Sequence, residues 1–244
     1  MNNSSEVVGT KVPIVYWSSA YFLAVGVLHL WGYWSAFDVN VLEYVSLTDI
    51  VKTAAYPIAS VFVFVAIGVL LGDVFFSHRS VQPGMGSGTP IGRIFNRYFP
   101  FLASAYALGT LAYFLLGSIE KWYVLPFLVG VPVSSALSEA GLLSSVVRGQ
   151  RARMKLLLLL SVLPFFSYGQ GALRAGDIVD GKKYSYVVSP IVGYELDMKT
   201  SRELRPRYVG KAGEQYFFWL PASRSLLNVS QSQIQQLEIK RQAR

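Results

Sequence analysis

The stretch Met154–Phe166, MKLLLLLSVLPFF, decides the topology that the sequence predicts for this chain. It lies in an apolar segment from about 154 to 171, and a membrane-spanning helix needs about 20 such residues. If the segment crosses a bilayer, the residues after it lie on the opposite side from the residues before it. If it enters the bilayer and returns, both lie on the same side.

Four more apolar segments precede it, at about 13–33, 54–76, 98–118 and 122–146. Together the five segments predict an α-helical multi-pass membrane protein, with five transmembrane helices in a domain of residues 1–175. The composition agrees, because 52% of the residues are hydrophobic and only 15% are charged. In soluble domains, about a quarter of all residues are charged.

Basic residues in the connecting loops predict the orientation. Positively charged loops stay in the cytoplasm, so the N-terminus and two arginine-containing loops are expected on that side of a bacterial-type inner membrane. The same arginines are candidates for contacts with lipid headgroups or with a cytoplasmic protein partner. They are Arg79, Arg93 and Arg97 in one loop, and Arg148, Arg151 and Arg153 in the next.

From about residue 180 to 240 the pattern changes to alternating apolar and polar residues, with a glycine-containing turn at 211–214. This pattern predicts a small extracytoplasmic domain of four or five antiparallel strands. So short a domain has little core of its own. We expect it to pack against the membrane surface, against the loop at 35–53, or against another subunit.

The loop at 35–53 contains a helix-start signal. Ser46 stands three residues before Asp49, which is the spacing of a capping residue and an acidic first turn. We expect a helix to begin there, with the segment before it on the outer membrane surface.

Polar residues inside the apolar segments are the candidate site. An ionised carboxylate in hydrocarbon is costly unless it is paired or faces a water-filled cavity. Glu139 could therefore be a structural contact in a helix–helix interface made by the serines around it, or it could line an ion pathway. Both roles are considered for Glu139, Asp73, Ser135, Ser138 and His29, and the structural role is the preferred one.

The sequence does not indicate catalytic chemistry, a cofactor or a metal site. There are no cysteines, and the two histidines are far apart in the chain. The net charge of +8 is placed mainly beside apolar segments, which favours lipid headgroups over nucleic acid as partners.

The sequence therefore predicts a non-enzymatic, homo-oligomeric membrane protein that acts as a sensor or scaffold. Its β-rich domain would receive a signal or partner outside, and its basic loops would bind a protein in the cytoplasm. An ion channel or transporter that uses Glu139 is the alternative. A membrane-bound enzyme is the third candidate.

Overall fold

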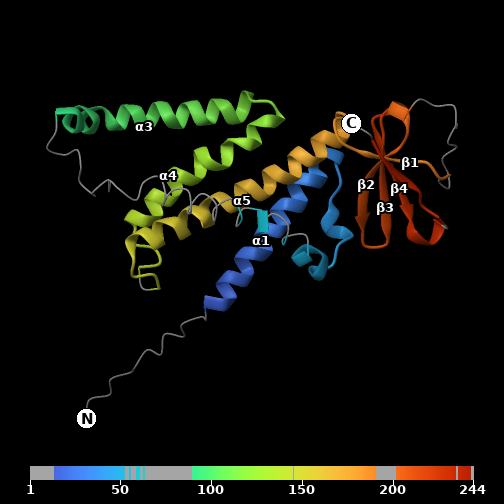
Figure 1. The fold of residues 1–244 in the computed structure, drawn as a ribbon, viewed down its shortest axis with the longest axis horizontal. Helices are drawn as coiled ribbons and strands as arrows, with labels where there is room; N and C mark the ends of the chain where they lie inside the picture. Colours follow the sequence, from blue (N-terminus) through green and yellow to red (C-terminus); the bar gives the residue numbers. More distant parts are fainter. Residues whose placement is uncertain are drawn as a thin grey trace, which may run out of the picture.

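The computed structural model describes residues 14–52, 55, 59–60, 63, 90–144, 146–190, 202–234 and 236–242. In this part of the chain, long helices lead to an antiparallel sheet at one end of the molecule (Figure 1). The long helices are α1 (Ile14–Trp34), α3 (Pro90–Leu116), α4 (Leu125–Glu139) and α5 (Gln150–Val179). Three short 3-10 helices connect or flank them, namely η1 (Ser35–Phe37), η2 (Val41–Glu43) and η3 (Ile119–Tyr123).

Helices α1 and α5 lie side by side and run in the same direction, so that both end at the sheet (Figure 1). Glycine allows their close approach. A Cβ atom on Gly32 would overlap the backbone of Tyr168, and a Cβ on Gly171 would overlap the His29 carbonyl oxygen and lie 2.7 Å from the Tyr33 nitrogen. Small residues at a crossing point let two helix backbones approach closely.

Helix α4 packs against α5 in the opposite direction. Gly130 of α4 faces Val162 of α5, whereas Trp122, just before α4, contacts Gly169 further along α5. The buried residues of α4 include Gly130 and Ser134, which are four residues apart and therefore share one helix face. This small-residue face is the part of α4 that meets α5.

Helices α4 and α5 each contain an internal proline, which removes the amide that would bond to the carbonyl four residues earlier. In both helices a tyrosine from a neighbouring helix supplies the missing donor. The Tyr106 hydroxyl of α3 donates to the Leu128 carbonyl, which Pro132 leaves without its usual partner. The Tyr21 hydroxyl of α1 donates in the same way to the Leu160 carbonyl, at 2.6 Å.

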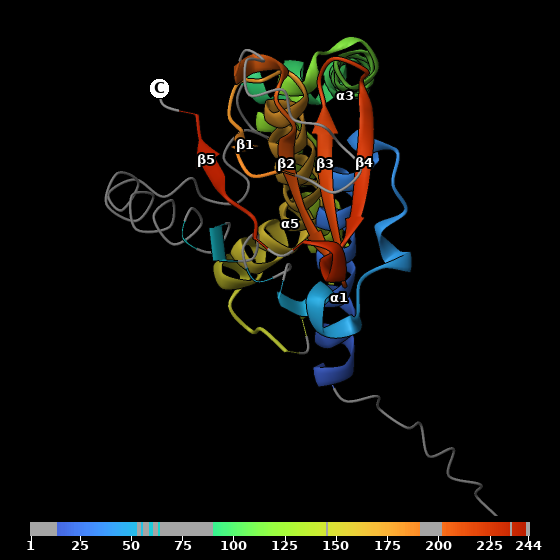
Figure 2. The same cartoon turned by 90° about the vertical axis from the view of Figure 1, so that its right-hand side faces the viewer.

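The sheet has five strands in the order β4-β3-β2-β1-β5, and every neighbouring pair is antiparallel (Figure 2). The predicted turn at 211–214 joins β2 to β3, where Gly213 has a φ of +56° and its neighbour Glu214 completes the turn. The antiparallel strands expected between about 180 and 240 are thus present. They are β1 (Ser185–Val187), β2 (Arg207–Ala212), β3 (Gln215–Leu220), β4 (Ser225–Ser230) and β5 (Ile239–Arg241).

The prediction of five transmembrane helices is wrong. Among the described residues, only Tyr16–Phe37 and Ala152–Val179 are helices long and apolar enough to cross a membrane. The apolar helix Phe101–Leu116 has fewer residues than the roughly 20 needed, and so has Leu125–Glu139. The architecture is a mixed one, in which helices and an antiparallel sheet are joined.

The reasons for the shorter helices are local. The segment predicted at 122–146 begins in a 3-10 helix and leaves the α-helical conformation after Glu139. There Gly141 and Leu143 adopt left-handed backbone conformations, with φ of 73° and 61°, and turn the chain. The segment predicted at 98–118 lies in α3, which has 27 residues, but the apolar part of this helix is only Phe101–Leu116. The segment predicted at 54–76 lies almost entirely outside the described residues.

The predicted helix start at Ser46 is confirmed. The Ser46 hydroxyl and the Asp49 carboxylate are 2.8 Å apart, the carboxylate accepts from the Ser46 amide, and residues 47–52 are helical. The two side chains together satisfy amides that have no partner within the helix.

Candidate functional site at the junction of helices and sheet

The helices and the sheet share one hydrophobic core, which we call the junction core. It consists of twelve buried residues from α1, η1, η2, α5, strands β1 to β3 and the residue just before β1. Aromatic rings form its centre, where Trp34 contacts Phe217 edge to face at 4.9 Å between ring centroids. Phe37 contacts Trp219, a partly buried residue that packs against this core, at 5.9 Å. The members are Leu30, Tyr33, Trp34, Phe37, Val41, Ala175, Ile178, Tyr184, Tyr186, Val209, Ala212 and Phe217.

Hydrogen bonds fix the same junction. The buried Tyr33 hydroxyl on α1 donates to the Val209 carbonyl of β2, a residue 176 positions later in the chain. A buried hydroxyl with a partner of this kind specifies one relative position of the helix and the strand, because losing the partner would leave a polar group in an apolar core.

Arg207 at the start of β2 caps the end of α5. Its guanidinium donates to the carbonyls of Ile178 at 2.6 Å and Val179 at 2.8 Å, and it stacks over the Tyr184 ring at 4.5 Å. The last carbonyls of a helix have no partner within the helix, and a cation near them is also favoured by the helix dipole. Helix α5 and strand β2 are therefore held together by a buried, directional contact.

Of the predicted site residues, His29 lies in the contact between α1 and α5. It is buried, and its Nδ1 atom is 3.0 Å from the Ser167 carbonyl oxygen. The Ser167 hydroxyl in turn donates to the Val25 carbonyl at 2.8 Å, so the two helices exchange polar contacts one turn apart. These contacts position α1 against α5.

The other predicted polar residues lie elsewhere. Glu139 is the exposed last residue of α4, and the Ser135 hydroxyl donates to the Val131 carbonyl of its own helix at 3.1 Å. Ser138 is half-buried one turn further on. These three residues therefore belong to the C-terminal part of α4, whereas His29 belongs to α1, and Asp73 lies outside the described residues.

The arginines of the predicted basic loops are spread over several elements. Arg148 is exposed just before α5, and Arg153 is half-buried in the first turn of that helix. Arg151 also belongs to α5, while Arg93 and Arg97 belong to the N-terminal part of α3. Arg79 lies outside the described residues.

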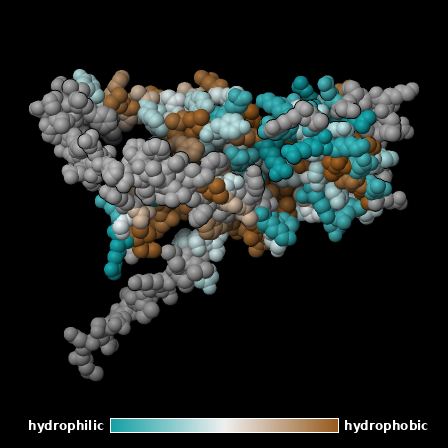
Figure 3. Space-filling view, viewed as in Figure 1, coloured by the Kyte–Doolittle hydropathy of each residue, from teal (hydrophilic) through white to brown (hydrophobic). Residues whose placement is uncertain are grey.

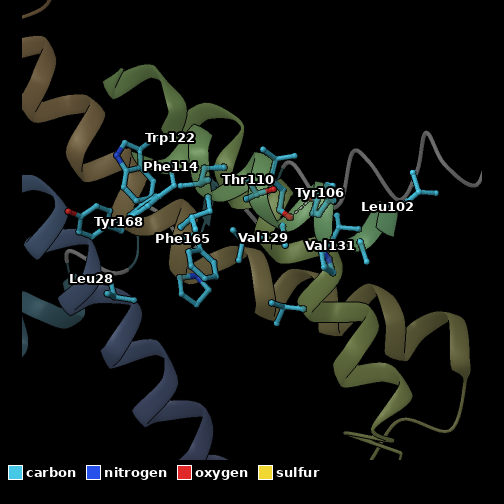
Figure 4. Close-up of a pocket in the computed structure, with 18 of the residues that line it drawn as sticks. Leu28, Leu102, Tyr106, Thr110, Phe114, Trp122, Val129, Val131, Phe165 and Tyr168 are labelled. Carbon is cyan, nitrogen blue, oxygen red and sulfur yellow. Dashed lines mark hydrogen bonds between the residues drawn. The ribbon is translucent and has the colours of Figure 1, made fainter. Parts of the chain in front are cut away.

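A large apolar groove lies between α3 and the other helices (Figure 4). Its volume is about 1310 Å³, and its walls come from α1, α3, η3, α4 and α5. On α3 the lining positions recur with helical spacing and thus form one face. Those positions are Leu102, Ala103, Tyr106, Ala107, Thr110, Leu111 and Phe114.

Neither the junction core nor the groove is predicted by the sequence pattern. The helical spacing of small and aromatic residues on 102–114 was the available signal for the groove. The junction core joins residues far apart in the chain, for which a single sequence carries no signal of this kind.

In the described part of the chain, no group of three or more His, Asp or Glu residues is placed to hold a metal ion. No protein-family model, curated protein or solved structure matches this chain. The fold itself defines the class of protein. It is a helical unit joined to an antiparallel sheet, and two of its described helices are long and apolar enough to cross a membrane.

Proposed function

We propose that this protein is a non-enzymatic, membrane-anchored sensor or scaffold in which the sheet binds a signal or partner and α1 and α5 pass its effect to the other side. The junction core is the observation that carries this proposal. It joins the sheet to both helices through buried rings and through the Tyr33 and Arg207 hydrogen bonds. A packed core of this kind does not deform gradually, so a shift of the sheet moves the helix ends with it.

The distribution of apolar residues supports membrane anchoring. Large hydrophobic side chains on the helices are left uncovered, including Trp17 at 68% exposure and Leu116 at 86%. Hydrophilic residues instead dominate much of the end that holds the sheet (Figure 3). Exposed apolar surface on this scale is typical of contact with a membrane or with another protein.

The orientation we propose places the sheet outside a bacterial-type inner membrane and the opposite helix ends in the cytoplasm. Arg148 and Arg153 lie at the end of α5 that is remote from the sheet. Basic residues close to membrane-spanning helices are retained on the cytoplasmic side. The exposed Arg148 region is then the surface offered to a cytoplasmic protein partner.

The orientation can be tested by cysteine labelling, because the chain contains no cysteine of its own. Ser232→Cys places a single thiol on an exposed residue beyond β4, and Arg148→Cys places one at the far end. In spheroplasts, a membrane-impermeant maleimide should label the first variant, and it should label the second only after lysis. The reverse pattern would overturn the orientation, and labelling of neither variant outside would place the whole chain on the inner side.

The coupling can be tested with the double variant Ser232→Cys/Arg148→Cys carrying two spin labels. The distance distribution between the labels should be narrow in the native background and should broaden when Trp34→Ala is added. Trp17→Ala, an exposed tryptophan at the other end of α1, is the matched control and should leave the width unchanged. An unchanged distribution in the Trp34→Ala background would show that the junction core does not couple the sheet to the helices.

A further inference from the structure

We propose that the groove between α3, α4 and α5 binds one hydrocarbon chain of an anionic phospholipid, with the phosphate of that lipid at Lys121. The proposal rests on the membrane anchoring proposed above and assigns a ligand to the helical unit. It follows from the lining of the groove, the uncovered face of α3, and the charge at one end.

The lining suits a hydrocarbon chain. Of the nineteen lining residues none carries a charge, and aliphatic and aromatic side chains predominate. The Tyr106 hydroxyl, one of the few polar groups in the walls, already donates to the Leu128 carbonyl. A polar ligand would therefore find few hydrogen-bond partners here, whereas an alkyl chain would remove apolar surface from contact with polar surroundings.

Helix α3 is apolar but largely uncovered by the rest of the described chain. From Phe101 to Leu116 every residue except Thr110 is exposed. A helix that is apolar around its whole circumference belongs in a protein core or in lipid. The small side chains of Ala103 and Ala107 on the lining face hold the groove open, because larger residues there would fill the space between α3 and α4.

Aromatic rings form a ladder across one end of the groove, and Figure 4 labels its members Phe114, Trp122 and Tyr168. Phe114 of α3 contacts Trp122 of η3 at 6.2 Å between centroids, and Trp122 contacts Tyr168 of α5 at 4.7 Å. Tyr168 contacts Trp31 of α1 at 6.0 Å. Trp and Tyr favour the depth of the lipid headgroups, so the ladder marks the end at which a headgroup would lie.

Lys121 stands beside this ladder and supplies the charge. Its ammonium donates to the Phe114 carbonyl and lies 5.0 Å from the centre of the Phe114 ring, while Phe114 itself lines the groove. The carboxylate of the adjacent Glu120 is 3.9 Å from Lys182. An ammonium group has three donors, so Lys121 can bind a phosphate oxygen while it keeps its contact with Phe114.

The proposal can be tested by native mass spectrometry of the purified full chain titrated with phosphatidylglycerol or with phosphatidylcholine. We expect one phosphatidylglycerol to bind about tenfold more tightly than phosphatidylcholine. Ala107→Phe fills the groove and should weaken phosphatidylglycerol binding by about tenfold or more. Ala105→Phe is the matched control, because Ala105 is an exposed α3 residue outside the lining, and it should bind like the native chain.

Lys121→Gln tests the headgroup. It should abolish the preference for phosphatidylglycerol while one lipid of either kind still binds. A preference that persists in this variant would overturn the assignment of the phosphate to Lys121. Equal binding by the native chain, Ala107→Phe and Ala105→Phe would overturn the groove as the site.

Two further outcomes separate this proposal from the proposed function. If Ala107→Phe changes the oligomeric mass and leaves lipid binding intact, a second copy of the chain occupies the groove and the lipid proposal fails, although membrane anchoring stands. If alkaline carbonate removes the native chain from membranes, the anchoring proposal fails and the lipid site fails with it.

Discussion

The Tyr21 hydroxyl donates to the Leu160 carbonyl at 2.6 Å, and Leu160 is the residue whose carbonyl Pro164 deprives of its intrahelical donor. Tyr21→Phe should therefore destabilise the fold by about 1–2 kcal/mol, because it leaves a carbonyl without a partner between two helices. Thermal unfolding in detergent, compared with Tyr123→Phe at an exposed site, measures the effect.

A double-mutant cycle isolates the contribution of the proline. In a Pro164→Ala background, the amide of residue 164 is restored and can bond to Leu160 within α5. In that background Tyr21→Phe should reduce the free energy of unfolding markedly less than it does when Pro164 is present. An equal cost in both backgrounds would mean that the tyrosine does not act by replacing the missing amide.

The close approach of α1 and α5 gives a second prediction. Gly171→Ala should destabilise the fold by about 1–3 kcal/mol, because the added methyl group would overlap the backbone of α1. Gly109 of α3 is the control, since a Cβ there meets nothing within 4 Å. Gly109→Ala should be neutral or stabilise by up to about 1 kcal/mol through helix propensity. Chemical denaturation of both variants gives the comparison, and equal effects would contradict the predicted role of Gly171.

The guanidinium of Arg207 caps α5, so its removal should loosen the junction. We expect Arg207→Met to destabilise the fold by about 2–3 kcal/mol, since buried carbonyls lose a charged donor. Arg207→Lys should recover only part of this stability, because an ammonium does not reproduce the planar fork of donors. Hydrogen exchange at residues 176–180 should rise in the same order, and Arg241→Met on the exposed β5 should leave it unchanged.

The contact between Ser46 and Asp49 gives a pH dependence. The Ser46 hydroxyl, and then its backbone amide, donate to the carboxylate and lower the pKa of Asp49 below its ordinary value of 3.8. A carboxyl whose pKa is lowered by folding adds stability above its unfolded pKa, and this stability is lost as the pH falls through the folded pKa. Ser46→Ala should raise the pKa of Asp49, as measured by NMR titration of the carboxyl carbon. A pKa of Asp49 that does not move would contradict the hydroxyl contact.

Parts of this fold follow from sequence pattern alone. The apolar segments at 13–33 and 154–171 mark the cores of α1 and α5, because a long apolar run favours a helix wherever it is buried. The alternation of apolar and polar residues after residue 180 marks the strands in the same way. In both cases the signal is local, and every residue of the element contributes to it.

Other parts depend on contacts that pattern does not contain. Helix α5 continues to Val179 through polar residues, where buried Ala175 and Ile178 belong to the junction core. Helix α4 ends early because two residues, Gly141 and Leu143, adopt left-handed conformations in a stretch that still looks apolar. Hydropathy averages over such a turn, which is why the number of long helices was overestimated.

The candidate site shows the same division. The buried His29 was identified from its position in an apolar helix, but its partner Ser167 comes from α5 and could not be paired with it in advance. The sequence places Glu139 well inside a helix that continues to 146, whereas Glu139 is the last residue of α4 and is exposed in the described chain. The predicted helix thus continues about two turns beyond the observed end, and this difference moves Glu139 from within a helix to its last residue.

The bond from Tyr33 to Val209 also has a consequence for biosynthesis. Its two residues are separated by 176 positions, so the ribosome completes α1 long before the strand that receives it exists. Contacts of such long range form late and slowly. Trp34 and Phe37 thus remain without their strand partners while most of the chain is translated, and the newly made protein passes through a stage in which this aromatic end of α1 is open to chaperones and to neighbouring nascent chains.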